Sequence, residues 1–264
     1  MSDEISVLMP IAPRAAWLDQ ATSSLLAQTH QSWHLLAVLD GECAENRAVL
    51  ERPELDGRVR IKVLPGQSGV ANALNAGLAE TRTELVARLD ADDICEPDRL
   101  ATQIKEFEGR PNLLVLGSGA TMINEQGHRV GQKRVPVGPR RVRRRLLWHN
   151  IIVHPSVVFR REAVVGAGGY DPRCLRGQDY ELWLRLAALG TLDNLAARLI
   201  RYRVHTGQHS RPLVGADETR SIRAARRRAV AASWAGLASA DARHLTWLSY
   251  QHVQTWRRRA RAGS

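Results

Sequence analysis

The sequence predicts an α/β fold, in which a mostly parallel sheet is flanked by helices and followed by a helical, arginine-rich C-terminal extension. Short apolar runs that suit strands buried on both faces alternate with segments of helical periodicity. Acidic and turn residues follow several of these runs, at the sheet edge where open α/β sheets bind ligands. We therefore expect one domain over residues 1–210 and the extension over residues 211–264.

The composition is that of a folded and strongly basic protein. Of the 264 residues, 44% are hydrophobic, and the formal net charge is +11. Residues 129–145 contain eight Lys and Arg and no acid, and residues 217–264 contain ten Arg against three acids. Such clusters suit nucleic acid, anionic lipid or a phosphorylated substrate, and they also occur as solvated helix faces.

The cysteines and the start of the chain indicate a reducing compartment. Cys43, Cys95 and Cys174 are widely spaced and form no C-x-x-C pair, which argues against a disulfide framework or a zinc site. The acidic start lacks the pattern of a signal peptide, and no apolar stretch reaches the ~20 residues that span a bilayer. We expect a cytoplasmic protein, either soluble or peripheral at the inner face of the membrane.

The first predicted unit is a strand, a helix and a second strand. Residues 5–9 form a compact apolar run, and apolar residues then recur at helical spacing from 17 to 28. Residues 35–39 form the second run, which ends in Asp40. This order, with polar residues at the strand ends, is typical of nucleotide-binding α/β proteins. No G-x-G-x-x-G or Walker-type loop occurs, so the sequence does not support those phosphate-binding loops.

The next two segments continue the alternation. Residues 59–63 alternate between apolar and basic side chains, which predicts a strand with one wetter face. Residues 69–78 carry a helical apolar stripe, and Gly69 and Gly77 leave room there for close backbone approach.

Three carboxylates within four positions follow the apolar run at residues 85–89. Asp90, Asp92 and Asp93 repel one another, so packing alone does not explain them. A divalent cation would explain them, because hard cations bind carboxylate oxygens and then accept a substrate's phosphates as further ligands. The alternative is a solvated acidic turn that caps a helix starting near Pro97.

The remainder of the chain predicts further elements. In order, these are a helix over residues 97–109, strands over 113–116 and 120–123, a turn over 124–127, a helix with an arginine-rich face where the basic segment leads into 146–150, a strand over 154–161 and a loop over 166–171. Asp179 then opens an amphipathic helix, and a plain N-cap is its alternative role. Residues beyond 211 are predicted to be helical.

Taken together, these stretches resemble the inverting family-two glycosyltransferases with the GT-A type fold. The similarity covers roughly residues 5–210, and the ordered set carries it because each motif alone is weak. The motifs are Val7-Leu8-Met9-Pro10, Asp40-Gly41, Gly69 with Asn75-Ala76-Gly77, Leu89-Asp90-Ala91-Asp92-Asp93, Pro97-Asp98-Arg99-Leu100, His154-Pro155-Ser156, Gly168-Gly169-Tyr170-Asp171, Asp179-Tyr180-Glu181-Leu182-Trp183 and Tyr202-Arg203-Val204-His205.

The resemblance implies an enzyme that moves a sugar from a nucleotide-diphospho-sugar to an acceptor hydroxyl with inversion. It implies bound Mn²⁺ or Mg²⁺ and a UDP-sugar as the first expected donor, with a GDP- or dTDP-sugar as the alternative. The expected acceptor is a saccharide or a lipid-linked saccharide, in the synthesis of cell-surface polysaccharide or glycolipid. No nucleic-acid partner is expected.

The same resemblance implies roles for individual residues. Asp179 matches the catalytic base, and Asp92 matches a direct metal ligand. Asp90 is expected at the metal, the donor ribose or a bridging water, and His205 at the metal or the diphosphate, with a surface histidine as its alternative. His154 is expected to be structural or on the acceptor side. The donor-binding positions are matched by Pro10, Asp40, Gly69, Asn75 and Asp90.

Three positions depart from the family pattern. Residues 10–13 are Pro-Ile-Ala-Pro where the family usually has Pro-x-Tyr-Asn, which removes an aromatic side chain that could flank the base. Leu39 stands where a second Asp often precedes Asp40. Both bear on which nucleotide is bound. Gln178 replaces a common Glu before Asp179 and bears on how that carboxylate is positioned.

Other classes of protein remain open on the sequence alone. A Mg²⁺-dependent phosphatase or phosphotransferase would use Asp90 as nucleophile, but such proteins usually carry the acidic pair on the first strand. A basic nucleic-acid-binding protein would use the Arg clusters, but the chain has two Phe and no recognisable nucleic-acid module. A catalytically inactive transferase-like protein is a further alternative, although Asp92 and Asp179 are both present.

The end of the chain combines aromatic residues with arginines. This combination suits a helix that lies on an anionic membrane surface, where a lipid-linked acceptor would be found. The alternative is a helix docked on the domain with a solvated end. The residues concerned are Leu245, Trp247, Leu248, Tyr250, Trp256 and the basic run at 257–261.

Overall fold

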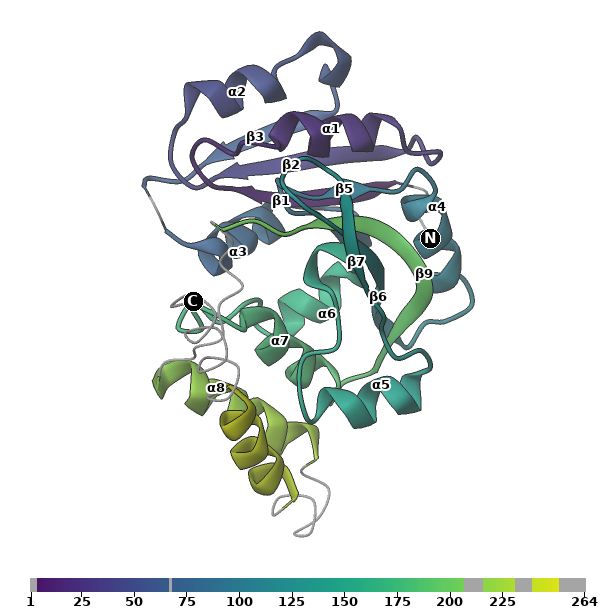
Figure 1. Cartoon of the computed structure of the whole chain (residues 1–264), viewed down its shortest axis with the longest axis vertical. Coiled ribbons are helices and arrows are strands. Elements are labelled where there is room, and N and C mark those ends of the chain that lie inside the picture. The colour runs from purple at the N-terminus through teal and green to yellow at the C-terminus, as the bar shows by residue number, and fades with distance from the viewer. Residues whose placement is uncertain (1–3, 67, 207–215, 231–238, 252–264) are drawn as a thin grey trace.

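The computed structural model describes residues 4–66, 68–206, 216–230 and 239–251 (Figure 1). Nine strands of the described chain form one sheet in the order β3-β2-β1-β4-β8-β6-β9-β5, with β7 paired to β6. They are β1 (Ile5–Ile11), β2 (Trp33–Leu39), β3 (Val59–Val63), β4 (Leu85–Arg88), β5 (Ile94–Cys95), β6 (Leu113–Ile123), β7 (Arg129–Lys133), β8 (Val158–Arg160) and β9 (Thr191–Arg203).

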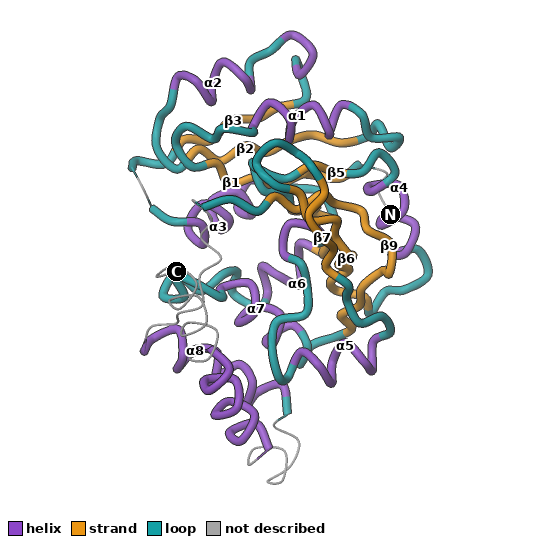
Figure 2. Tube along the Cα trace, viewed as in Figure 1, coloured by secondary structure: helices purple, strands orange, loops and turns teal. Residues whose placement is uncertain are grey.

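Helices connect these strands and cover the sheet (Figure 2). They are α1 (Leu18–Leu26), α2 (Ala44–Leu50), α3 (Val70–Glu80), α4 (Arg99–Phe107), α5 (Pro139–Leu146), α6 (Arg161–Gly166), α7 (Gln178–Leu186) and α8 (Ala216–Ala229), with short 3₁₀ helices η1 (Pro53–Leu55) and η2 (His154–Ser156). Residues 239–251 form a further helix.

The expected α/β class is confirmed, and the sheet is mixed. Strands β3, β2, β1 and β4 are parallel, and so are β6 and β9. Strand β8 runs antiparallel to β4 and β6, and β5 and β7 run antiparallel to their partners. The predicted turn at residues 124–127 explains β7, because a short hairpin joins only antiparallel strands.

Hydrophobic side chains form two cores, one on each face of the sheet. Alternate residues of β1 point to opposite faces, as the period of two in a strand requires. Ile5, Val7 and Met9 pack with α1 and α4, whereas Leu8 packs with α3 and α7. Coverage of both faces explains why β1, β2 and β4 are almost wholly apolar.

Several element boundaries differ from those predicted. Residues 113–123 form one strand rather than two, because Gly117 and Gly119 allow close approach to β9 instead of ending the strand. A Cβ at Gly117 would lie 2.4 Å from the Asn194 side-chain oxygen. The helix expected from Pro97 begins at Arg99. The strand expected over residues 154–161 is limited to β8, after the 3₁₀ helix η2. Strands β5, β7 and β9 and helices α2 and α6 had no counterpart in the sequence prediction.

Gly77 provides a test of how closely α3 packs on the sheet. A Cβ at this position would lie 2.2 Å from Leu8 Cδ1 and 3.0 Å from Val38 Cγ2, both in fully buried side chains. We expect Gly77→Ala to lower the free energy of unfolding by about 1–3 kcal/mol through overpacking. Gly166→Ala is the control, because no atom lies within 4 Å of its added Cβ. Equal urea midpoints for the two variants would contradict the prediction.

The described part of the C-terminal extension packs on the domain. Ile222 and Ala225 of α8 and Trp247 of helix 239–251 are buried in the core that includes α7. The Trp247 and Tyr180 rings lie 6.1 Å apart between centroids. Trp247 therefore follows the alternative of a helix docked on the domain. Leu245 and Tyr250 are exposed. Trp256 and the basic run at 257–261 lie outside the described residues.

Candidate active site

The three predicted carboxylates gather at the end of β4. One ligand oxygen from each of Asp90, Asp92 and Asp93 lies within 4.8 Å of the other two. Strand β4 is parallel to β1, and the backbone N–H of Leu89 donates to the Leu8 carbonyl before the acids begin. The carboxyl end of the buried strand thus fixes where the acidic group stands, as expected for an open α/β sheet.

Asp93 is buried, and only one of its two carboxylate oxygens has a hydrogen-bond partner. Its Oδ1 accepts a 2.7 Å hydrogen bond from the backbone N–H of Arg203, whereas its buried Oδ2 has no partner. Burial raises the pKa of Asp93 well above its usual value, and the charges of Asp90 and Asp92 raise it further. An unpaired buried carboxylate oxygen is costly, so this oxygen is a natural place for a bound cation.

The raised pKa of Asp93 predicts a pH-dependent cost to stability. The native state binds the Asp93 proton more tightly than the unfolded state does, so ionisation destabilises the native protein. The cost is absent below the ordinary Asp pKa and grows as pH rises towards the raised value. In EDTA at pH 7, we expect Asp93→Asn to raise the free energy of unfolding by about 1 kcal/mol. The gain should shrink towards pH 4, and urea unfolding that shows no gain at pH 7 would contradict it.

Arg88 lies beside Asp90 and is a site residue that the sequence did not single out. Its side chain is 2% exposed and contacts Asp90 Oδ1 at 2.5 Å. Burial raises the pKa of Asp90, and Arg88 opposes this effect. The charges of Asp92 and Asp179 also raise the pKa of Asp90, so the Asp179 carboxylate acts electrostatically on the acidic group.

The end of β9 is fastened to the same acidic group. His205 Nε2 lies 2.9 Å from Asp92 Oδ2, and the His205 and Trp17 rings are 4.9 Å apart between centroids. The Arg203 guanidinium donates to the Asp92 carbonyl at 2.9 Å. The structure thus places the predicted residue His205 beside the predicted metal ligand Asp92.

Asp179 lies in the first turn of α7. Gly177, in the left-handed region at φ +70°, is the N-cap, so the alternative of Asp179 as a plain N-cap is wrong. Asn150 donates a 2.6 Å hydrogen bond to Asp179 Oδ2. Burial raises the pKa of Asp179, although the Asn150 hydrogen bond opposes the shift. The pKa therefore moves towards neutral pH, as a general base requires.

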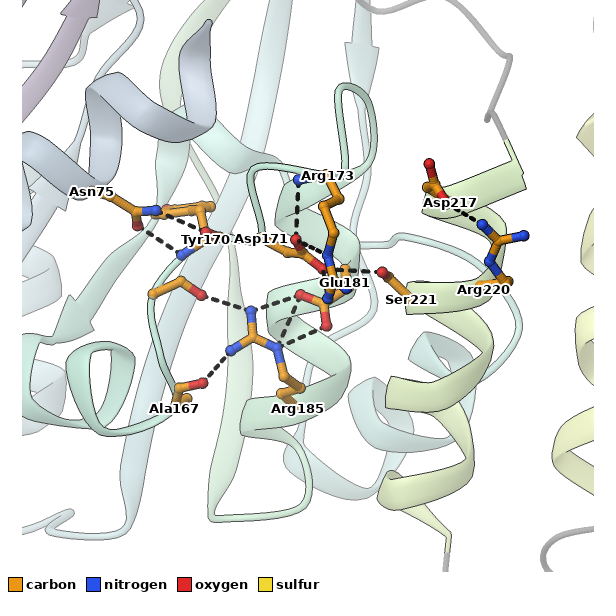
Figure 3. Close-up of polar contacts among 11 residues, drawn as sticks. Asn75, Ala167, Tyr170, Asp171, Arg173, Glu181, Arg185, Asp217, Arg220 and Ser221 are labelled. Carbon is orange, nitrogen blue, oxygen red and sulfur yellow. Dashed lines mark hydrogen bonds and ion pairs between the residues drawn. The ribbon is translucent and has the colours of Figure 1, made fainter. Parts of the chain in front are cut away.

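Glu181, on the same helix, lies beside Arg185 (Figure 3). Its side chain is buried and forms a two-oxygen ion pair with Arg185, at 2.6 Å for the shortest contact. The Arg185 guanidinium also donates to the carbonyls of Ala167 and Gly169. This network fixes the loop before α7 against the helix, so the role of Glu181 is structural.

The predicted donor-binding residues lie along β1, β2 and α3. Pro10 pairs with Val38 in the parallel ladder of β1 and β2. Asp40 follows β2, and its two oxygens accept the backbone N–H groups of Ser68 and Gly69, at 2.6 and 2.8 Å. These bonds fix the start of α3, where Gly69 is the N-cap at φ +86°.

Asn75 joins α3 to the glycine-containing loop before α7 (Figure 3). Its side-chain amide donates to the Tyr170 carbonyl and accepts from the Tyr170 N–H, both at 2.8 Å. The Tyr170 hydroxyl lies 2.9 Å from His154 Nε2. Burial lowers the pKa of His154 well below its usual value, so this histidine is neutral. Asn75 and His154 therefore position the loop.

Lys133 is a second residue that the sequence did not single out. It ends β7, and its Nζ lies 3.5 Å from the centroid of the Tyr202 ring. Burial lowers the pKa of Lys133, while the charges of Asp93, Asp179 and Asp90 oppose that shift. Its position among eight basic residues of one sequence segment gave no signal that distinguished it from the others.

The residues at this site fit a divalent cation. The donor set combines three carboxylates with an imidazole nitrogen, and one buried carboxylate oxygen lacks a partner. Mg²⁺ and Mn²⁺ prefer oxygen ligands of this kind.

Within the described ranges, none of the helices combines the length and apolar character needed to cross a bilayer.

Comparison with known proteins finds glycosyltransferases among the relatives of this chain. The chain is 31% identical over 209 residues to the O-antigen biosynthesis glycosyltransferase WbnJ of Escherichia coli, covering 77% of this chain and 80% of WbnJ. It is 35% identical over 188 residues to the amylovoran biosynthesis glycosyltransferase AmsE of Erwinia amylovora, covering 70% of each.

Solved structures show the same fold. The crystal structure of S. aureus TarS 1-349 in complex with UDP-GlcNAc matches with a TM-score of 0.71 at 15% identity, covering 93% of this chain and 71% of that chain. Residues 6–166 match the family model for glycosyl transferase family 2, which is more than half of the chain. The protein is therefore a member of glycosyl transferase family 2.

Proposed function

We propose that this glycosyltransferase moves a sugar from a nucleotide-diphospho-sugar to an acceptor hydroxyl, with inversion and with the help of Mn²⁺ or Mg²⁺. One observation carries the proposal: the three carboxylates at the end of β4 offer oxygens within 4.8 Å of one another, and the charge of the candidate base, Asp179, raises the pKa of one of them, Asp90. Donor and acceptor chemistry require these two groups to be neighbours, because the reacting atoms must meet at near-attack distance.

The acidic group would serve the donor. Asp92 would hold the cation directly, and Asp90, Asp93 and His205 are the further candidates to contact it or the diphosphate. When bound, the cation neutralises the charge that develops on the departing nucleotide diphosphate. Arg88 would keep Asp90 ionised and oriented through its buried ion pair.

Asp179 would serve the acceptor. A hydroxyl is a poor nucleophile at neutral pH, so a carboxylate must take its proton as it attacks. Asn150 would hold the Asp179 carboxylate in place through its 2.6 Å hydrogen bond. Attack on the face opposite the leaving group inverts the anomeric carbon, and one enzymic base is enough for that reaction.

The proposed donor is a UDP-sugar. TarS, which shares the fold, has been solved with UDP and with UDP-GlcNAc. In this chain, Pro10, Asp40, Gly69 and Asn75 would form or support the nucleotide side of the site, with Asp40 at the base or ribose. The proposed product is a cell-surface polysaccharide, because WbnJ and AmsE are named for the biosynthesis of O-antigen and of amylovoran. The proposed acceptor is a saccharide or a lipid-linked saccharide.

Incubation with a panel of nucleotide sugars tests this function. With Mn²⁺ and no acceptor, we expect slow hydrolysis of one UDP-sugar, followed by release of UDP. Hydrolysis of GDP- or dTDP-sugars instead would change the proposed nucleotide. Turnover of phosphate esters without turnover of any nucleotide sugar would contradict the proposal, because it would favour a phosphotransferase.

Lys133 gives a further test of the donor side. The Lys133 ammonium lies 3.5 Å from the centroid of the Tyr202 ring, and the charges of Asp93, Asp179 and Asp90 act on its pKa. We propose that it contacts a donor phosphate oxygen. We expect Lys133→Met to reduce kcat/KM for the donor by ~10–100-fold, the range for loss of one hydrogen bond to a charged group. Arg129→Met, at the exposed start of the same strand, is the control. Unchanged donor kinetics in Lys133→Met would exclude this role.

A further inference from the structure

One face of α5 is basic and exposed, and we propose that it docks the enzyme on an anionic phospholipid membrane. Val142 and Leu146 bury the other face of the helix in the core. Arg140, Arg141, Arg144 and Arg145 are exposed, and none of them forms an ion pair with any described residue. Four cations with no ion pair among the described residues, on one helix of eight residues, form a basic surface that suits phosphate groups.

An aromatic residue continues this surface. Trp148 follows α5 and is 42% exposed, and the Arg243 guanidinium carbon lies 5.4 Å from the centroid of its ring. Tryptophan favours the interface between lipid and water, and adjacent arginines bind lipid headgroups. We define the α5 face as the set of these residues, namely Arg140, Arg141, Arg144, Arg145, Trp148 and Arg243.

The α5 face is connected to the candidate base, Asp179, through the residues that follow Trp148. Asn150, two residues beyond Trp148, donates the 2.6 Å hydrogen bond to Asp179. A membrane that contacted Trp148 would therefore bring a lipid-linked acceptor to the acceptor side of the site. This link between membrane and acceptor rests on the proposed function. The position of the α5 face beside the acceptor side favours a membrane over a nucleic acid, because a nucleic acid at this place would have no relation to the acceptor.

Vesicle binding tests the proposal without any catalysis. The full-length protein is sedimented with vesicles of phosphatidylglycerol mixed with phosphatidylcholine, and with vesicles of phosphatidylcholine alone. We expect binding only to the anionic vesicles, falling as salt rises. A variant in which Arg140, Arg141, Arg144 and Arg145 are changed to Gln should bind ~100-fold more weakly or worse, because each cation near an anionic surface contributes.

Two variants with the same loss of charge serve as controls. One changes the exposed residues Arg82, Lys105, Arg129 and Arg198 to Gln, on other parts of the surface. The other changes Arg257, Arg258, Arg259 and Arg261, the basic run at the end of the chain, to Gln. We expect both controls to retain most of the binding. If either control loses as much affinity as the α5 variant, the assignment to the α5 face is wrong.

Three further measurements complete the test. Brominated phosphatidylglycerol should quench tryptophan fluorescence in the wild type and less in Trp148→Phe, and equal quenching would contradict contact with Trp148. Displacement from vesicles by glycerol phosphate at the same phosphate concentration, or equal binding to duplex DNA, would also overturn the proposal. Donor hydrolysis in solution should be unchanged in the α5 variant, so failure of docking is distinguishable from failure of the proposed activity.

Discussion

Asp92→Asn is expected to abolish most donor turnover while leaving the fold intact. The change removes one negative charge from the proposed cation site, and loss of a group that stabilises developing charge commonly lowers the rate by ~10²–10³-fold. The fold should survive, because the Asn oxygen can still accept the 2.9 Å contact from His205 and the repulsion with Asp90 and Asp93 is relieved. Steady-state donor hydrolysis and thermal unfolding measure the two effects.

Asp98→Asn is the matched control for this experiment. Asp98 is exposed at the start of α4, where its side chain makes no capping hydrogen bond, so activity should not change. EDTA should reproduce the effect of Asp92→Asn in the wild type, and added Mn²⁺ should reverse it. Full activity of the wild type in excess EDTA would show that the reaction needs no divalent cation and would defeat the proposed role of Asp92.

The sequence predicted the parts of the fold in which local pattern and tertiary environment agree. Strands β1, β2 and β4 lie under helices on both faces, so their continuous apolar runs were unambiguous. Strand β9 was missed because its middle residues are exposed, and neither alternation nor an apolar run marks it. The glycines of β6 resembled breaks, because their close neighbours come from a segment almost 80 residues away.

The candidate site was predictable where residues follow a strand end or open a helix. Asp90 and Asp92 were found from their position after a strand, Asp179 was marked as the acid that opens a helix, and the resemblance added the site role of Asp179 and His205. Arg88 was missed because one basic residue within an apolar run gives no sign of its partner, whereas in the structure its side chain is 2% exposed and forms an ion pair with Asp90. Lys133 was missed because only tertiary folding separates it from the other basic residues of its segment.

Asp179→Asn is expected to lower turnover of the acceptor by ~10²–10⁴-fold, the typical contribution of a general base. Stability should change little, because Gly177 rather than Asp179 is the N-cap and the Asn150 amide can still donate to the amide oxygen of the substituted side chain. Burial raises the pKa of the Asp179 carboxylate, so its ionisation destabilises the native state. At pH values above that pKa, the substitution should therefore increase the free energy of unfolding slightly. Transfer assays and thermal unfolding give the two readouts.

Glu181→Gln on the same helix should show the opposite pattern. Breaking its buried ion pair with Arg185 should cost about 3–5 kcal/mol of stability, while turnover per folded molecule should stay near normal. In the wild type, kcat/KM should fall as pH drops through the raised pKa of Asp179, at a higher pH than an ordinary Asp would give. Asp179→Asn should remove this acid limb. Near-normal transfer by Asp179→Asn would exclude Asp179 as the base. The base would then have to come from outside α7, because the Glu181 carboxylate is engaged in its ion pair with Arg185.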